Sequence, residues 1–113
     1  MYKPMIDSAT FTRCIKEAID KLRQYEFEEA YKLIIKAISI NPDAYQPQNL
    51  LGLWYELSGN NDKARKHYRA AYSLDPTFKP ACKNLERIST LFLSKYIPYD
   101  YGDEPEEENT TKK

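Results

Sequence analysis

Apolar and polar positions follow the helical period over most of the chain. From about Ser8 to Gln24 one apolar stripe recurs every three or four residues, formed by Cys14, Ile15, Ala18, Ile19 and Leu22. A second stripe covers about Phe27 to Ile40, formed by Ala30, Leu33, Ile34, Ala37 and Ile38. Both segments are therefore predicted to be amphipathic helices with one face turned to a core.

Prolines and glycines mark where the helices end. Asn41-Pro42 ends the second helix, because a residue before proline is displaced from helical geometry. Three more helices follow from the same reasoning, at about Ala44 to Ser58, Asp62 to Leu74 and Lys79 to Tyr96. The fourth carries its expected inward positions at Ala64, Tyr68, Ala71 and Tyr72. The pattern predicts an all-α protein of five antiparallel helices.

Several residues recur at a spacing of 34 positions. The pairs are Ala30 and Ala64, Ala37 and Ala71, Ser39 and Ser73, Pro42 and Pro76, and Leu51 and Leu85. A period of this length is typical of a helix-turn-helix unit that buries its apolar face only by stacking on copies of itself. The alanines stand where helices must approach closely, because a larger side chain would push the helix axes apart.

The composition is that of one small domain, and the charge is distributed unevenly along the chain. The chain has 113 residues, 42% of them hydrophobic, and a net charge of zero. Residues 1–98 hold 15 basic and 11 acidic side chains, a net charge of +4, whereas residues 99–113 hold 2 and 6, a net charge of −4. A body charge of +4 is far below the dense basic face of a nucleic-acid-binding protein, so we do not expect that partner class.

Residues 99–113 are expected to form an acidic, disordered tail. The stretch from Asp100 to Asn109 has too little apolar content to fold alone. An alternative stays open, since Tyr99 and Tyr101 supply aromatic anchors beside the acidic residues. The tail would then fold back on the basic body, or dock on a neighbouring molecule, with effective concentration favouring the first.

Residues 45–78 resemble one tetratricopeptide repeat. The signature positions are occupied by Leu51, Gly52, Tyr55, Gly59, Ala64, Tyr68, Ala71 and Pro76. Residues 11–44 resemble a second copy that departs from the pattern at Glu17, Lys21 and Tyr25, where leucine, tyrosine and glycine are usual. Residues 79–96 are similar to the closing helix of the family. The resemblance implies an α-α superhelix over residues 1–98.

The resemblance also implies a function and a surface for it. Members of this family bind proteins or peptides in a groove lined by the first helix of each pair, which gives a non-catalytic interaction module or adaptor. Carried over residue by residue, the groove here would be lined by Ile15, Ile19, Arg23, Gln46, Asn49, Leu53, Lys83, Asn84 and Arg87. Ile15 and Ile19 have a competing interpretation as core residues. A ligand suited to this surface has apolar anchors followed by carboxylates.

Two further alternatives concern self-association and catalysis. The groove or the tail could hold two copies together as a homodimer. An enzyme is not expected, because His67 is the single histidine and neither Cys14 nor Cys82 is placed to pair with it. The two cysteines are expected to be buried free thiols, and no metal or cofactor is expected. The sequence shows no secretion signal and no apolar run that would span a membrane, so a cytoplasmic location is expected.

Overall fold

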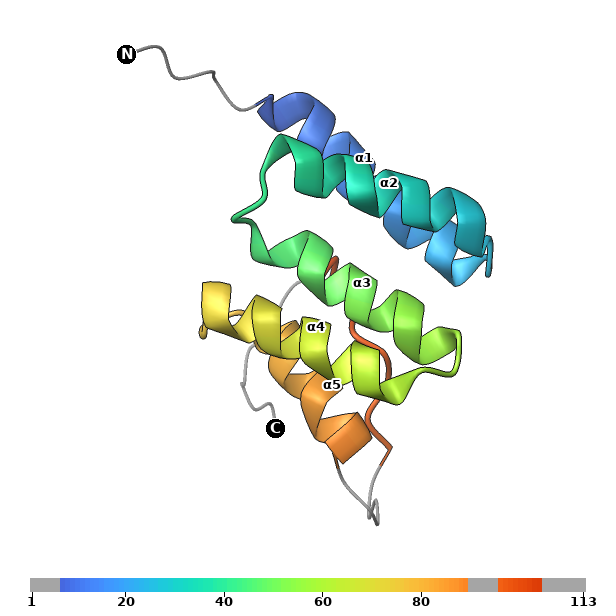
Figure 1. Cartoon of the computed structure of the whole chain (residues 1–113), viewed down its shortest axis with the longest axis vertical. Helices are drawn as coiled ribbons and strands as arrows, with labels where there is room; N and C mark the ends of the chain where they lie inside the picture. Colours follow the sequence, from blue (N-terminus) through green and yellow to red (C-terminus); the bar gives the residue numbers. More distant parts are fainter. Residues whose placement is uncertain (1–6, 90–95, 105–113) are drawn as a thin grey trace, which may run out of the picture.

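The computed structural model describes residues 7–89 and 96–104. Five helices follow one another, and their bounds are α1 (Ser8–Arg23), α2 (Phe27–Ile40), α3 (Tyr45–Leu57), α4 (Asn61–Leu74) and α5 (Lys79–Ser89). Figure 1 shows the helices side by side in chain order, with α1 at one end and α5 at the other. The expected all-helical repeat fold is confirmed, and the described residues contain no strand.

The first four helices form two hairpins with similar corners. Asp7 caps α1 by accepting a hydrogen bond from the backbone N–H of Thr10 at 3.1 Å, and Asn60 caps α4 in the same way through Lys63 at 3.1 Å. The corner of the second hairpin contains Gly59 at φ 91°, and the corner of the first contains Tyr25 at φ 60°. Tyr25 therefore adopts the left-handed conformation that glycine provides in the other hairpin.

Each hairpin closes on small residues, and the hairpins then pack on one another. Helix α1 packs on α2, α3 on α4, and α5 on α4, while α2 also contacts α3. The alanines predicted at close helix contacts are fully buried, at Ala18, Ala30, Ala37, Ala64 and Ala71. Larger side chains fill the space between the helices, among them Leu22, Ile34, Leu50, Leu53 and Tyr68. The inward register predicted from the 34-residue period is therefore confirmed at these positions.

Trp54 joins the two hairpins. Its indole Nε1–H donates a hydrogen bond to the carbonyl oxygen of Phe27 at 2.8 Å. Its ring contacts those of Phe27, Tyr31 and Tyr55, with centroids between 5.0 and 6.2 Å apart. The tryptophan is half-buried and its polar atom is satisfied, which is the usual arrangement for an indole at a packing interface.

Tyr72 does not lie inward as expected. Its side chain is 45% exposed, whereas its neighbour Ala71 is fully buried. One residue along a helix rotates the side chain by about 100°, which carries Tyr72 off the stripe formed by Ala64, Tyr68 and Ala71. Tyr72 thus lies at the edge of the inward stripe, and the prediction that it faces inward is wrong.

The end predicted for the fifth helix, at Tyr96, is also wrong. Helix α5 is described from Lys79 to Ser89, and Tyr96 itself is not helical. A guanidinium N–H of Arg87 donates to the carbonyl oxygen of Pro98 at 2.9 Å. Those residues would stand roughly 16 Å apart along a continuous helix, so Pro98 does not lie on a continuation of α5.

The boundary predicted between folded body and disordered tail, at residue 99, does not hold for residues 99–104. Ile97 is 8% exposed, and Tyr101 packs against the hydrophobic core. We call residues 96–104 the tail segment. It cannot bury apolar area by itself, but it does so against helices that are already assembled. The remainder of the predicted disordered tail, residues 105–113, lies outside the described residues.

Candidate functional site

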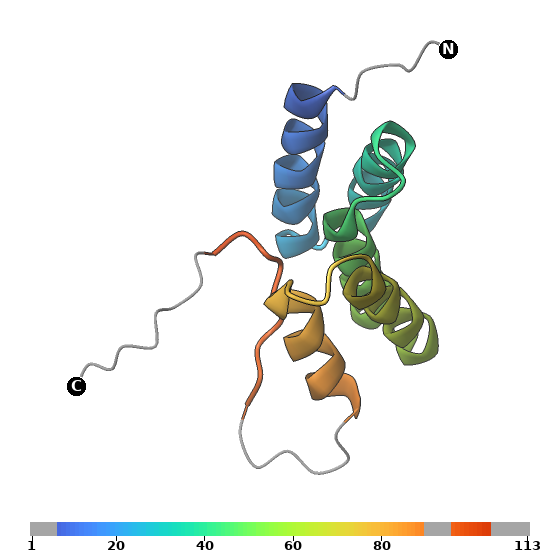
Figure 2. The same cartoon turned by 90° about the vertical axis from the view of Figure 1, so that its left-hand side faces the viewer.

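The first helix of each hairpin, together with α5, borders the tail segment. Figure 2 shows this segment, in orange-red, running beside α5 and up to the C-terminal end of α1. Among the predicted groove residues, five contact it directly: Arg23, Asn49, Lys83, Asn84 and Arg87. We use the word groove below for the surface formed by these five residues. In this structure the groove is filled by the chain's own residues.

The other predicted groove residues have different positions. Ile19 and Leu53 are 3% and 0% exposed and belong to the hydrophobic core, against which Ile15 also packs. The core interpretation is therefore the correct one for Ile19, and Leu53 is likewise inaccessible to a partner. Gln46 is half-buried in the first turn of α3.

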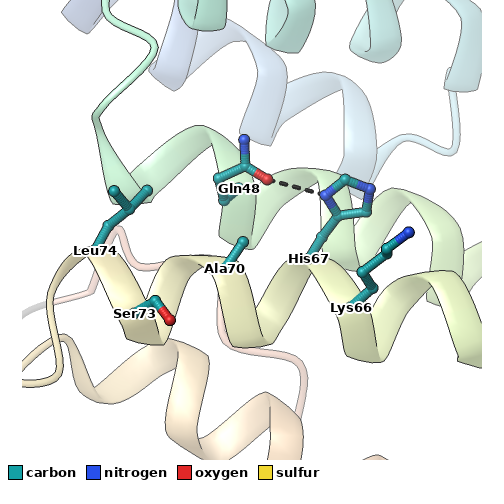
Figure 3. A pocket seen from close by; sticks show the side chains of 6 residues that line it. All are labelled: Gln48, Lys66, His67, Ala70, Ser73 and Leu74. Atoms are coloured by element: carbon teal, nitrogen blue, oxygen red, sulfur yellow. Dashed lines mark hydrogen bonds between the residues drawn. The ribbon is translucent and has the colours of Figure 1, made fainter.

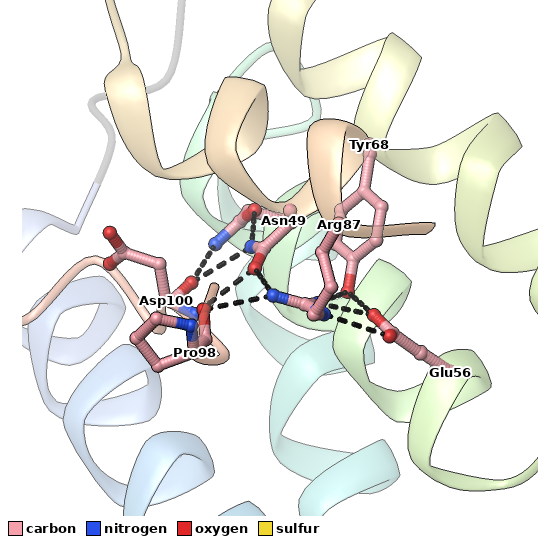
Figure 4. Close-up of polar contacts among 7 residues, drawn as sticks. Asn49, Glu56, Tyr68, Arg87, Pro98 and Asp100 are labelled. Carbon is pink, nitrogen blue, oxygen red and sulfur yellow. Dashed lines mark hydrogen bonds and ion pairs between the residues drawn. The ribbon is translucent and has the colours of Figure 1, made fainter. Parts of the chain in front are cut away.

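Two buried asparagines hold the backbone of the tail segment at Asp100. The side-chain amide of Asn84 accepts a hydrogen bond from the Asp100 N–H at 3.0 Å and donates one to the Asp100 carbonyl at 2.9 Å. Asn49 donates a second hydrogen bond to the same carbonyl at 3.1 Å. Asn84 also donates to Asn49 at 2.9 Å, which fixes both amides (Figure 4). Because these bonds involve only backbone atoms of the segment, they do not depend on the side chain at position 100.

Arg87 links the buried core to the tail segment. Its guanidinium forms an ion pair with Glu56, including a hydrogen bond from Nε to Oε2 at 3.0 Å, and both side chains are 10% exposed. It also donates to the Pro98 carbonyl and lies 4.4 Å from the centre of the Tyr99 ring. Burial lowers the pKa of Arg87, but the hydrogen bonds and charge of Glu56 outweigh this and raise it overall. Arg87 therefore stays charged, as a cation–π contact requires.

The same Glu56 carboxylate orients Tyr68 from the opposite side. The Tyr68 hydroxyl donates to Oε1 of Glu56 at 2.7 Å. Burial of the phenol, followed by the Glu56 charge, raises the pKa of Tyr68, so the hydroxyl keeps its proton and remains a donor. Figure 4 shows that the core tyrosine, the ion pair and the backbone of the tail segment form one continuous polar network.

Arg23 holds the far end of the tail segment. Two guanidinium nitrogens donate to the Asp103 carboxylate at 2.6 and 3.1 Å, and the guanidinium lies 4.3 Å from the centre of the Tyr101 ring. These hydrogen bonds keep the pKa of Asp103 below its ordinary value. Lys83 approaches the Asp100 carboxylate at 3.7 Å. Arg23 also lies 3.9 Å from the Glu104 carboxylate, so cations of the body face each acid of the tail segment.

Gly102 lies close to the ring of Phe78, where a larger residue has no space. It has φ 83°, and a Cβ atom built there would lie 3.0 Å from the ring of Phe78. A side chain at this position would strain the backbone and press on Phe78, so glycine allows the segment to pass from Tyr101 to Asp103.

A family comparison covers the second hairpin. The model of the tetratricopeptide repeat matches residues 46–78, which contain nearly all of α3 and the whole of α4. Residues 46–78 are a tetratricopeptide repeat. Comparison with curated proteins and with solved structures gave no match. Tetratricopeptide repeats are protein-interaction modules and are typically non-catalytic, which agrees with the function expected from the sequence.

The repeat also has a hollow on the side away from the tail segment. It is lined by Gln48 from α3 and by Lys66, His67, Ala70, Ser73 and Leu74 from α4 (Figure 3). His67 lies 2.9 Å from the Gln48 side-chain oxygen and stacks on Tyr55 with an interplanar angle of 6°. Burial, followed by the charges of Lys66 and Lys63, lowers the pKa of His67. The imidazole is therefore neutral at pH 7 and is held by its contact with Gln48 and by stacking on Tyr55.

The described ranges contain neither a candidate metal site nor a candidate membrane-spanning helix. No group of three His, Cys, Asp or Glu side chains suited to a metal ion occurs within residues 7–89 and 96–104. Over those ranges no helix combines the length and the apolar character needed to cross a membrane. Cys14 is buried, whereas Cys82 is half-buried rather than fully buried as expected, and both are free thiols.

The sequence had left open, as an alternative to a disordered tail, that the tail folds back on the basic body, and residues 96–104 do so. Ile97, Tyr99, Tyr101 and Asp103 stand at alternate positions, which is the period of an extended chain that presents one face. The sequence did not indicate the ion pair between Glu56 and Arg87. That pairing depends on how closely α3 approaches α5, and the sequence of either helix alone does not predict this distance.

Proposed function

We propose that the tetratricopeptide repeat domain binds an extended segment of a partner protein in the groove that the tail segment occupies here. The observation that carries this proposal is the pair of asparagines at Asp100. Asn84 pairs with both the N–H and the carbonyl of one residue, as a neighbouring strand would, and Asn49 adds a second bond to the carbonyl. Such contacts recognise an extended backbone of almost any sequence.

The burial of these asparagines supports the proposal. Both are 0% exposed, and a buried amide without partners costs about 1–3 kcal/mol. The described part of the structure contains no buried side-chain nitrogen or oxygen without a hydrogen-bond partner. When the groove is vacant these amides bond to water, and a chain that covers them must replace those bonds or leave buried amides without partners. This requirement favours an extended backbone with a free N–H and carbonyl, whether it belongs to a partner or to the tail segment.

The test requires a full-length chain whose tail segment is released. Substitution of Tyr99→Ala, Tyr101→Ala and Asp103→Asn together removes side-chain contacts of the segment while leaving every groove residue in place. We call this the released variant, and its fold is checked by its melting curve. A labelled peptide with the sequence of residues 96–104 is then titrated by fluorescence anisotropy. We expect saturable binding to the released variant.

A single backbone change in the peptide isolates the role of the asparagines. Methylation of the nitrogen that corresponds to Asp100 removes its bond to Asn84 without altering any side chain. We expect the methylated peptide to bind at least tenfold more weakly than the parent. Equal binding of the two peptides would show that the asparagines do not hold the backbone and would contradict the proposal.

The same contacts made between two molecules would give the homodimer that was the alternative function. The tail segment would then lie in the groove of a second copy, with Arg23 of one molecule against Asp103 of the other. Effective concentration favours the intramolecular arrangement seen here at ordinary protein concentrations. Sedimentation equilibrium distinguishes the two, and we expect a monomer for the full chain.

A further inference from the structure

The side chains of the tail segment, in addition to its backbone, are matched by the groove. Tyr99 lies on the guanidinium of Arg87 and Tyr101 on that of Arg23, at 4.4 and 4.3 Å from the ring centres. Arg23 then uses two nitrogens to bind the carboxylate of Asp103. Two cations on different helices thus contact two rings and the Asp103 carboxylate, which follow one another at alternate positions of the segment. Arg23 also lies 3.9 Å from the carboxylate of Glu104.

Each of these contacts discriminates between ligands. An arginine above an aromatic ring is attracted by the ring's negative face, and an aliphatic side chain lacks that attraction. A two-pronged arginine–carboxylate pair fixes both the distance and the orientation of the acid. Because Arg23 contacts Tyr101 and Asp103 at once, the second ring and the acid must be separated by one residue. The residue between them is Gly102, which has no side chain that would press on Phe78.

We propose that the groove selects partner segments with the pattern aromatic, any residue, aromatic, small residue, acid, and that the tail segment is a built-in competitor which such a partner must displace. This inference rests on the proposed function, because it names the ligand class and the regulation of the same groove. The tail segment presents the full pattern through Tyr99, Tyr101, Gly102 and Asp103.

Tethering makes the competition strong. A segment joined to its site by a short stretch of the same chain acts at an effective concentration on the order of millimolar. The tail segment follows α5 after only residues 90–95. A partner segment of equal intrinsic affinity must therefore approach millimolar concentration, or bind more tightly, before it enters the groove. The tail segment therefore blocks the groove until such a partner displaces it or a change in the tail weakens its binding.

The first experiment tests the competition. The labelled 96–104 peptide is titrated against the wild-type chain, the released variant and a Tyr96→Ala control. Tyr96 belongs to the tail segment but is 77% exposed, so its substitution should leave the segment in place. We expect at least tenfold tighter binding to the released variant than to the wild type, and no change for the control. Equal affinity for the wild type and the released variant would overturn the competitor role.

The second experiment tests the selected pattern on the released variant. Peptides with both tyrosines replaced by alanine, or with the acid corresponding to Asp103 replaced by asparagine, are expected to bind at least tenfold more weakly. An Arg23→Gln substitution in the released variant should abolish the difference between acid and amide, because the group that distinguishes them is then absent. Melting curves establish that this variant remains folded.

The outcomes separate this inference from the proposed function. If the substituted peptides bind as well as the parent while backbone methylation still weakens binding, the selected pattern is wrong and the proposed function stands. If the released variant is folded and binds none of the peptides, both are wrong. A persistent acid preference after Arg23→Gln would also overturn the assignment of the acid to Arg23.

Discussion

The ring of Tyr68 lies directly on Gly52. A Cβ atom built on Gly52 would stand 2.4 Å from two carbons of that ring, and Tyr68 is fully buried. This contact joins α3 and α4 within the tetratricopeptide repeat. It also places the Tyr68 hydroxyl next to Glu56, so the packing of one hairpin positions the ion pair below the tail segment.

Gly52→Ala is therefore expected to destabilise the domain. The methyl group has no space unless the ring moves, and overpacking of this kind costs about 1–3 kcal/mol. Urea unfolding followed by circular dichroism measures the loss. A double-mutant cycle with Tyr68→Ala is the control, because the penalty of the added methyl group should largely disappear once the ring is gone. An unchanged penalty in the cycle would mean that Gly52 matters for another reason.

The next prediction concerns the register of α4. Ala71 is fully buried at a close helix contact, and Ala71→Leu should cost about 1–3 kcal/mol of stability by overpacking. Ala70→Leu is the matched control, since Ala70 is half-buried and lines the open hollow beside Leu74. The same leucine should be much less harmful there. Similar melting temperatures for the two variants would contradict the observed register.

The fold could be predicted from sequence because its signals are local. The stripe through Ala18 and Leu22 lies within one helix, and Pro42 marks the short corner between two helices. The recurrence of Ala30 at Ala64 repeats one local pattern in the next hairpin. The errors arose where the local sequence pattern was compatible with two different tertiary arrangements. Tyr72 lies beside Ala71 at the edge of the inward stripe, and only the position of neighbouring helices decides that it faces outward.

The candidate site was predictable in part. Family positions correctly placed Asn49, Asn84 and Arg87 on one surface, since they lie on the first helix of the repeat and on the helix that follows it. The occupant was not predictable from composition, because the acidic stretch after Tyr99 lacks the apolar content to fold alone. Its order depends on donors and rings that helices α1, α3 and α5 bring together. Such long-range complementarity is absent from any local window.

Arg87→Met should destabilise the domain strongly. The substitution leaves the Glu56 carboxylate buried without its counter-charge, and breaking a buried pair costs about 3–5 kcal/mol. It also removes the contacts to Pro98 and Tyr99. The double variant Arg87→Met with Glu56→Leu is expected to recover much of the stability, because no unpaired charge remains. A double variant as unstable as the single one would show that the unpaired charge of Glu56 is not the cause of the loss.

Asp103→Asn should loosen the end of the tail segment without changing the global melting temperature greatly. The amide keeps the shape of the carboxylate but loses the charge that binds Arg23. Hydrogen exchange of the Gly102 and Asp103 backbone N–H groups should become faster, while that of α3 stays unchanged. In the wild type, 1 M salt should produce a similar change, because the Debye length then falls to about 3 Å. Glu17→Gln, at an exposed pair with Arg13, is the control.

The stability of the second hairpin should depend on pH through His67. Burial lowers its pKa in the folded chain below the ordinary value of 6.5, with Lys66 and Lys63 acting in the same direction. The unfolded chain therefore binds a proton more readily, and stability should fall as the pH drops below about 6.5 until the lowered pKa is passed. Urea midpoints measured from pH 7.5 to 5.0 give this slope. His67→Gln provides the reference, because it cannot titrate at this position and carboxylates elsewhere contribute equally to both chains. The wild type should lose more stability than the variant over this range, and parallel curves would show that the imidazole is not held in its neutral form.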